Sequence, residues 1–169
     1  MAAFKIDEID QIILSELAVN ARKPFLEIAR ECGISGAAIH QRVRKLEENG
    51  IIAGSRLLIK PTMLDLNVCA FVSVTLSQAD KYPEVIKCLK DIPEITECYF
   101  VTGKASLMFK IYCRNNEHLM HVLVENIQMI PYVQSTDTMI TLDEVFNRHV
   151  KTTGYGDGYV KRKKNRKKE

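Results

Sequence analysis

A chain of 169 residues has room for one large domain or two small ones. Hydrophobic residues make up 46% and charged residues 27% of it, as in an ordinary globular protein that folds in water. No apolar run approaches the ~18–20 residues that span a bilayer, and acidic residues near Asp7 replace the basic and apolar pattern of a secretory signal. We therefore expect a cytoplasmic protein with no membrane partner.

The charge is unevenly distributed along the chain, although its net value is only +3. Residues 161–169 carry seven basic side chains and one acidic one, and residues 1–60 carry nine basic and eight acidic ones. Residues 61–160 carry eight basic and twelve acidic side chains. Because carboxylates repel phosphates, the acidic middle is unsuited to lying on nucleic acid, whereas the two ends are suited to it.

The cysteines and histidines do not indicate a disulfide framework or a metal site. The five cysteines are odd in number and widely spaced, without a CxxC pair: Cys32, Cys69, Cys88, Cys98 and Cys113. His118 and His121 share a predicted helix face, but no third ligand stands at a matching spacing. No paired carboxylates or nucleophile–base set is found either. The sequence therefore predicts no catalytic residue, no metal and no cofactor.

The stretch 1–60 predicts a winged helix-turn-helix domain. Asp7 is a good N-cap for an amphipathic first helix. A second helix begins at Pro24, and the short turn Gly33-Ile34-Ser35 joins it to a third helix that Ser35 caps. Two helices joined by such a turn form a helix-turn-helix. The segment 51–59 predicts two short strands around a glycine turn, which would form the wing.

The third helix has a core side and a side suited to DNA. At about 100° per residue, Ile39, Val43 and Leu46 cluster on the core side. Opposite lie small residues and the Arg and Gln types that make bidentate contacts to base edges. The residues predicted to contact DNA are Ser35, Gly36, Ala37, His40, Gln41, Arg42, Arg44, Lys45 and Arg56.

Within this set, Gln41 and Arg44 are expected at the bases, and Arg42 and Arg56 at phosphates. The alternative is that the basic stretch is simply a solvated helix face, as most such stretches are. Its position in a helix-turn-helix favours DNA binding.

The stretch 61–150 predicts a second domain with the order β-α-β-β-α-β. Lys60-Pro61 marks the boundary, because the residue before a proline is pushed out of helical geometry. The expected strands are 68–76, 95–102, 106–113 and 133–143, and the expected helices are 82–91 and 116–130. This order is the ferredoxin-like arrangement, so the predicted fold class is α+β.

The stretch 151–169 predicts a disordered basic tail, with three glycines followed by KRKKNRKK. Its basic residues would add salt-dependent contacts to phosphates, or they form a solvated end without a role.

The chain resembles the leucine-responsive/asparagine regulator (Lrp/AsnC) family of transcription factors from about Phe4 to Val145. The stretches that carry the resemblance are IDEIDQIILSEL, ARKPFLEIARECGIS, IHQRVRKLEENGIIAGSRLLIKPTMLDL, FVTGKASLMFKI and VQSTDTMITLDEV. The resemblance implies a homodimer formed through the sheets of the C-terminal domains, with dimers joining into octamers or larger discs. It also implies two helix-turn-helix heads on a roughly palindromic operator in double-stranded DNA. A small effector, usually an amino acid, would bind between C-terminal domains.

One loop departs from the family pattern. Amino-acid-responsive members typically read Gly-Asp-aromatic-Asp where this chain has Gly103-Lys104-Ala105-Ser106. Inside a pocket, Lys104 would repel an ammonium group and favour a carboxylate or phosphate; alternatively it is a solvent-facing turn residue. The residues predicted to bind an effector are Thr102, Gly103, Lys104, Ser106, Thr136 and Thr138. We hypothesise that the effector is another metabolite rather than an ordinary amino acid, or that there is none.

Three function classes follow from these observations. A sequence-specific, nucleoid-associated transcriptional regulator fits the reading helix and the resemblance. A nucleoid-type architectural protein fits the basic tail. A sirohaem-decarboxylase-like enzyme shares the two-part architecture, but a basic reading helix would serve no purpose in such chemistry.

Overall fold

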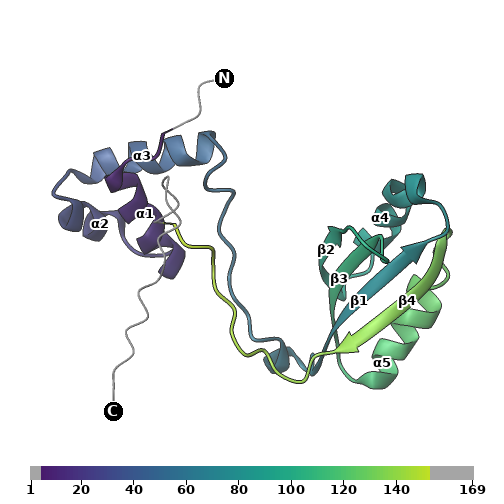
Figure 1. Ribbon diagram of the computed structural model, residues 1–169. Coiled ribbons are helices and arrows are strands. Elements are labelled where there is room, and N and C mark those ends of the chain that lie inside the picture. The colour runs from purple at the N-terminus through teal and green to yellow at the C-terminus, as the bar shows by residue number, and fades with distance from the viewer. Residues whose placement is uncertain (1–4, 153–169) are drawn as a thin grey trace, which may run out of the picture. The chain divides into compact units, whose positions relative to one another are not determined.

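The computed structural model describes residues 5–152, which fall into two compact units (Figure 1). Among the described residues, the first unit holds 5–57 together with 147–152, and the second is Leu58–Phe146. Most of the predicted basic tail, from residue 153 onward, lies outside the described residues. None of the helices in residues 5–152 is both long and apolar enough to cross a membrane.

The first unit is built from three helices: α1 (Glu8–Val19), α2 (Phe25–Cys32) and α3 (Gly36–Glu48). The helix-turn-helix prediction is confirmed, and so are its signals. Asp7 caps α1, and Gly33 ends α2 in the left-handed conformation at φ 66°. The side chain of Ser35 accepts a hydrogen bond from the amide of Ala38 at 3.2 Å and so caps α3.

The core of this unit is small and lies where the helices meet. Its buried members come from all three helices: Ile13, Ile28, Ala29, Ile39, Val43 and Leu46. Ile12, although apolar and on α1, is 38% exposed. An ion-pair bridge supplements this core, because Nζ of Lys23 lies 2.6 Å from both Glu16 and Glu31 and so joins α1 to α2.

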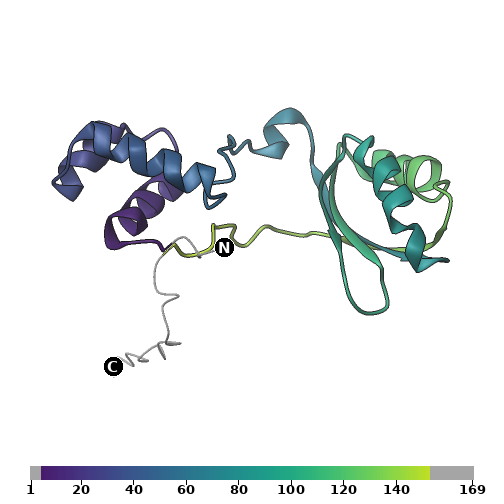
Figure 2. The same cartoon turned by 90° about the horizontal axis from the view of Figure 1, so that it is seen from above.

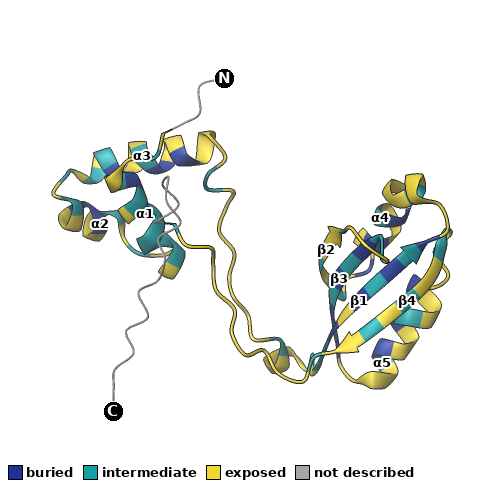
Figure 3. Cartoon of the chain, in the orientation of Figure 1, coloured by how far each residue is buried: buried dark blue, intermediate teal, exposed yellow. Residues whose placement is uncertain are grey.

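The two strands predicted for the wing do not form, since residues 51–60 contain no strand. Figure 3 shows much of this segment as exposed, and Leu57, Leu58 and Ile59 are 69%, 75% and 59% exposed. The physical reason is that a lone two-stranded ribbon buries too little apolar surface to be stable in water. The segment is therefore an extended connection rather than a hairpin.

The second unit confirms the predicted βαββαβ order. Its strands are β1 (Val68–Leu76), β2 (Ile95–Phe100), β3 (Leu107–Cys113) and β4 (Val133–Ile140), and its helices are α4 (Tyr82–Lys90) and α5 (Asn116–His121). Short 3-10 turns at Pro61–Leu64 and Ala79–Lys81 precede β1 and α4. The strands form one antiparallel sheet in the order β2-β3-β1-β4, and both helices cover the same face (Figure 2). The other face is open.

Strand alternation explains the two faces of this sheet. Residues such as Val72 and Val74 point to the helices and are fully buried, while their neighbours Phe71 and Ser73 point to the open face. β3 alternates in the same way, with Phe109 at the centre of the core. The apolar face of the sheet and the two helices therefore form one core.

The second predicted helix, 116–130, changes its winding after His121. Residues Val122–Ile127 form a π-helical turn, and the amide of Gln128 donates to the carbonyl of Leu123, five residues back. Val122 and Ile127, also five residues apart, are both buried against the sheet. The wider turn therefore directs both side chains into the core.

Candidate functional site

The third helix presents the polarity that the sequence predicts. Ile39, Val43 and Leu46 are buried, whereas Gln41 and Arg44 are exposed on the other side. Ser35, Ala37, His40 and Lys45 are exposed as well, and Gly36 is half-buried. Figure 3 shows this alternation of buried and exposed positions along α3. The structure thus brings eight of the nine predicted DNA residues onto or next to one helix, and most of their side chains face solvent.

The side chains of Arg44 and His40 each contact a neighbouring side chain. Nε of Arg44 lies 2.9 Å from Oε1 of Glu48, one turn further along α3, and the Arg44 side chain is 80% exposed. An exposed pair of this kind contributes only about 0.3–0.5 kcal/mol, so DNA can displace it. The His40 ring meets the Phe25 ring edge to face, with centroids 4.6 Å apart, which links α3 to α2.

Arg42, expected at a phosphate, forms an ion pair with two carboxylates, and its contact with DNA stays a prediction. Nη1 of Arg42 donates hydrogen bonds to Oδ2 of Asp7 at 2.6 Å and to Oδ1 of Asp10 at 2.8 Å. The hydrogen bond from the Asp10 amide, followed by that from Arg42, lowers the pKa of the Asp7 carboxyl below its usual value. One nitrogen of the guanidinium is thus engaged by the carboxylates of Asp7, the N-cap of α1, and Asp10.

Arg56 lies in the exposed connection after α3. Because no strand forms there, no regular structure holds Arg56 at a fixed place beside the reading helix.

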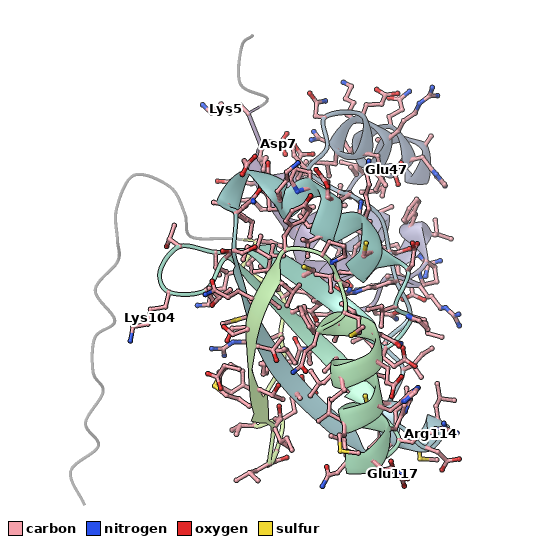
Figure 4. All side chains as sticks on the ribbon, turned by 90° about the vertical axis from the view of Figure 1, so that its right-hand side faces the viewer. Lys5, Asp7, Glu47, Lys104, Arg114 and Glu117 are labelled. Carbon is pink, nitrogen blue, oxygen red and sulfur yellow. The ribbon has the colours of Figure 1, made fainter. Side chains whose placement is uncertain are left out.

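The loop between β2 and β3 holds the residues that depart from the family pattern. Gly103 adopts φ 117°, a conformation that favours glycine. The amide of Ser106 donates to the carbonyl of Val74 at 2.8 Å, and the hydroxyl of Thr75 donates to the carbonyl of Lys104 at 3.4 Å. These bonds tie the loop to the end of β1. The Lys104 side chain itself is exposed and extends away from the domain (Figure 4).

Two threonines of the predicted effector set lie on the edge strand β4. Thr136 pairs with Val74 and Thr138 with Val72, so both lie on the helix-covered face of the sheet. The hydroxyl of Thr136 also accepts a hydrogen bond from Nε2 of Gln128 at 3.0 Å. The structure thus brings Ser106 and Thr136 to opposite sides of Val74. It leaves Thr102 exposed on the loop.

Gln128 is a candidate effector residue that the sequence did not indicate. It follows the π-helical turn, and its direction depends on that turn, which has no recognisable signature in the sequence.

Two surface hollows lie elsewhere on the second unit. One, of about 650 Å³, runs along α5 between Arg114 and Glu125, and the other, of about 340 Å³, lies between α4 and β2. Neither is lined by the loop at 103–106 or by the β4 threonines. The loop of a single chain therefore lies outside both hollows.

His118, one of the two histidines considered as metal ligands, has other partners in the structure. Nε2 of His118 lies 3.2 Å from Oε1 of Glu94, and its Nδ1 accepts a hydrogen bond from the amide of Arg114 at 3.3 Å. Across residues 5–152 no group of three His, Cys, Asp or Glu side chains is arranged to hold a metal ion.

Both units match known family models. Residues 6–47 match the AsnC-type helix-turn-helix domain, and residues 69–150 match the Lrp/AsnC ligand binding domain. The chain belongs to the Lrp/AsnC family. The α+β fold class and the resemblance expected from the sequence are thereby confirmed.

Relatives of this Lrp/AsnC chain are named as transcriptional regulators. The regulatory protein AsnC of Escherichia coli K12 is 38% identical over 151 residues, which cover 89% of this chain and 99% of that protein. The structure of E. coli AsnC superposes with a TM-score of 0.83 at 38% identity, covering 88% of this chain and 99% of that one. The HTH-type transcriptional regulator FL11 of Pyrococcus horikoshii is 39% identical over 137 residues, covering 81% and 89% of the two chains. The protein is therefore a DNA-binding transcriptional regulator of this family.

One solved relative carries a ligand. A feast or famine regulatory protein from M. tuberculosis, complexed with L-methionine, is 29% identical with a TM-score of 0.78 and covers 85% of this chain and 96% of its own.

Proposed function

We propose that this Lrp/AsnC regulator acts at the nucleoid and recognises palindromic operators through α3, with Gln41 and Arg44 at the base edges. The observation that carries the proposal is that α3 has a buried apolar face and, opposite to it, an exposed polar face. Ile39 and its buried neighbours hold α3 against the core, and the opposite face presents Gln41 and Arg44 to solvent. Arg and Gln are the side chains that pair bidentately with guanine and adenine.

The open face of the sheet supports self-association, as the family resemblance implies. Phe71, Tyr99 and Met139 lie on this face and are 37%, 54% and 51% exposed. Lys110, on the same face, lies 5.9 Å from the Phe71 ring centroid and 5.1 Å from that of Tyr112. Such a concentration of large apolar side chains favours an interface. A two-fold dimer would carry two reading helices to a palindrome, and larger assemblies such as octamers would join dimers.

The second unit is proposed to bind a small effector near the 103–106 loop. The match of this unit to the Lrp/AsnC ligand binding domain supports a ligand here, and one relative is complexed with L-methionine. Lys104 replaces the acids that suit an ammonium group, so it favours a ligand recognised through a carboxylate or phosphate. Thr136 and Gln128 would supply neutral hydrogen bonds from the neighbouring strand and helix end. The effector would act by favouring one assembly or DNA-binding state over another.

A genome-wide binding map, repeated in rich and minimal medium, tests the DNA-binding proposal. The expected result is a set of discrete palindromic sites that Gln41→Ala and Arg44→Ala abolish. Arg114→Ala, an exposed arginine of the second unit, is the matched control and should leave the sites unchanged. Occupancy unaffected by the α3 variants would contradict the proposal.

An architectural, DNA-compacting role is the second candidate, and the seven basic residues of 161–169 favour it. Broad coverage in the same map, with a steep salt dependence that deletion of 160–169 flattens, would support it. An enzymatic role of the sirohaem-decarboxylase kind predicts a Soret band when haem is added, and we expect none.

A further inference from the structure

The N-terminus of α1 carries a buried charge that the DNA-binding proposal does not use. Asp10 is only 4% exposed. Among the residues that the structure describes, it is the one charged residue that is buried. Its Oδ2 accepts a hydrogen bond from the Asp7 amide at 3.2 Å, while Asp7 Oδ1 accepts one from the Asp10 amide at 2.8 Å. This reciprocal capping box holds both carboxylates at the first turn of α1, where Figure 4 labels Asp7.

Arg42 links this capping box to the reading helix. Its Nη1 lies 2.6 Å from Asp7 and 2.8 Å from Asp10, so one nitrogen holds both carboxylates. The sequence separations are 35 and 32 residues, which makes this a contact between helices rather than within one. A buried carboxylate that loses its cation is left with an uncompensated desolvation cost. A DNA phosphate that captured Arg42 would impose that cost on Asp10.

The position of Arg42 on α3 means that its pairing with Asp7 and Asp10 also affects the direction in which Arg44 points. Arg44 follows two residues later and thus points about 200° away around the helix. When Arg42 points to α1, Arg44 points to solvent, as their side-chain exposures of 30% and 80% reflect. The apolar contacts of Ile39, Val43 and Leu46 hold α3 against the core, but the hydrophobic effect behind them is non-directional. Two short charge-assisted hydrogen bonds are directional and fix the rotation of α3 closely.

We propose that Arg42 is a positioning residue for DNA recognition: with Asp7 and Asp10 it locks the rotation of α3, so that Gln41 and Arg44 meet the base edges. Arg42 makes no phosphate contact in the complex. This inference rests on the proposed use of α3 as the reading helix and specifies what sets its orientation.

The decisive variant is Asp7→Asn. Asparagine is as good an N-cap as aspartate, so the capping hydrogen bond survives while the charge held by Arg42 is lost. Removing an acid makes the domain more positive, so simple electrostatics predicts tighter binding to DNA. Loss of positioning predicts the opposite, namely weaker binding to the operator with unchanged or tighter binding to random DNA. The two explanations thus differ in sign.

The measurement is the affinity of the full chain for two duplexes over a series of salt concentrations. One duplex is selected by the protein from a random-sequence pool, and the other is a scrambled sequence of equal length. The variants are Asp7→Asn, Asp10→Asn, Arg42→Gln and Arg44→Gln, each checked by urea unfolding so that binding is compared between folded proteins. Should Asp10→Asn or Arg42→Gln fail to fold, Asp7→Asn and Arg42→Lys provide the comparison.

We expect Asp7→Asn and Arg42→Gln to weaken selected-duplex binding about fivefold or more, the loss that a misaligned bidentate base contact produces. A variant that combines Asp7→Asn with Arg42→Gln should bind the selected duplex no more weakly than Arg42→Gln alone, because both changes disrupt the same link. The salt slope should stay unchanged, whereas loss of a phosphate contact lowers it by ~0.9 per contact.

Two results would overturn the inference: a lower salt slope for Arg42→Gln, or parental or tighter binding of the selected duplex by Asp7→Asn. If Arg44→Gln also leaves binding unchanged, the fault lies with the reading-helix proposal itself. If Arg44→Gln weakens binding while Asp7→Asn does not, only the positioning role is wrong.

Discussion

Arg44 and Glu48 form an ion pair along the exposed face of α3, with 2.9 Å between Nε and Oε1. A base edge that binds Arg44 must compete with this carboxylate. Glu48→Gln should therefore tighten operator binding about twofold, since an exposed i,i+4 pair contributes ~0.3–0.5 kcal/mol. Titration of labelled operator DNA at fixed salt measures the change.

The matched control is Glu47→Gln, which removes the same charge from a neighbouring exposed glutamate, whereas the carboxylate that pairs with Arg44 is that of Glu48. Both variants reduce the general repulsion of DNA equally, so their difference isolates the Arg44 pair. Equal effects from the two variants would show that Glu48 does not compete for Arg44.

The free energy of unfolding of the first unit should depend on pH because of Asp7. Hydrogen bonds from the Asp10 amide and then from Arg42 lower the pKa of the Asp7 carboxyl in the folded state. A lowered pKa means that this stabilisation is complete above the unfolded value, near 3.8, and is lost as the pH falls through the folded value. In urea unfolding between pH 2 and 7, the free energy of unfolding should fall less steeply toward acid pH for Asp7→Asn than for the parent. Glu8→Gln, an exposed acid of the same turn, is the control, and an unchanged slope in Asp7→Asn would contradict the prediction.

The periodic features of the chain were predictable from sequence because a core repeats with the geometry of its elements. Val72 and Val74 alternate along a strand, and Ile39 and Val43 recur one turn apart along a helix, so pattern alone assigns them to the core. The caps at Asp7, Ser35 and Gly33 were predictable for a similar reason, since each satisfies a purely local need. Elements and faces thus follow from residue spacing.

Contacts between elements did not follow from the sequence. The partner of Arg42 is 32 to 35 residues away, and only the packing angle of α1 on α3 brings them together. The hydrogen bond from Gln128 to Thr136 depends on a π-helical turn that lacks a sequence signal. The prediction of two wing strands was wrong for a related reason. A sequence pattern can be compatible with a strand, but a stable strand also needs a partner backbone to pair with.

The core of the second unit should depend strongly on Phe109. It is fully buried at the centre of β3 between the helices and the sheet. Phe109→Ala removes a ring that the surroundings can only partly replace, so the free energy of unfolding should fall by about 3–5 kcal/mol. Leu142→Ala, at a fully exposed position, should change it by less than ~0.5 kcal/mol. Urea denaturation monitored by circular dichroism measures both, and a small effect of Phe109→Ala would mean that this core is loosely packed.

Self-association through the open sheet face predicts a position-dependent effect of a new charge. Met139 lies on that face of β4 and is 51% exposed, whereas Met120 lies on α5 and is 60% exposed. Met139→Glu should bury a charge in the interface and shift sedimentation toward the monomer, because an unpaired buried charge is costly. Met120→Glu adds the same charge elsewhere and should leave the assembly intact. If Met139→Glu sediments like the parent, the interface does not include the β4 side of this face.

Ligand selectivity should follow the charge of the loop between β2 and β3. The Lys104 carbonyl is tied to Thr75 of β1, so the loop backbone is held while the exposed side chain remains able to meet a ligand. Calorimetry with L-asparagine, L-methionine and their 2-oxo acid counterparts should show that the parent prefers the ligands that lack an ammonium group. Lys104→Asp should reverse that order, because an acid attracts the ammonium that lysine repels. Lys87→Asp, which makes the same change at an exposed position of α4, should leave the order unchanged. Tight binding of either amino acid by the parent would show that Lys104 faces solvent in the assembled protein and takes no part in selecting the effector.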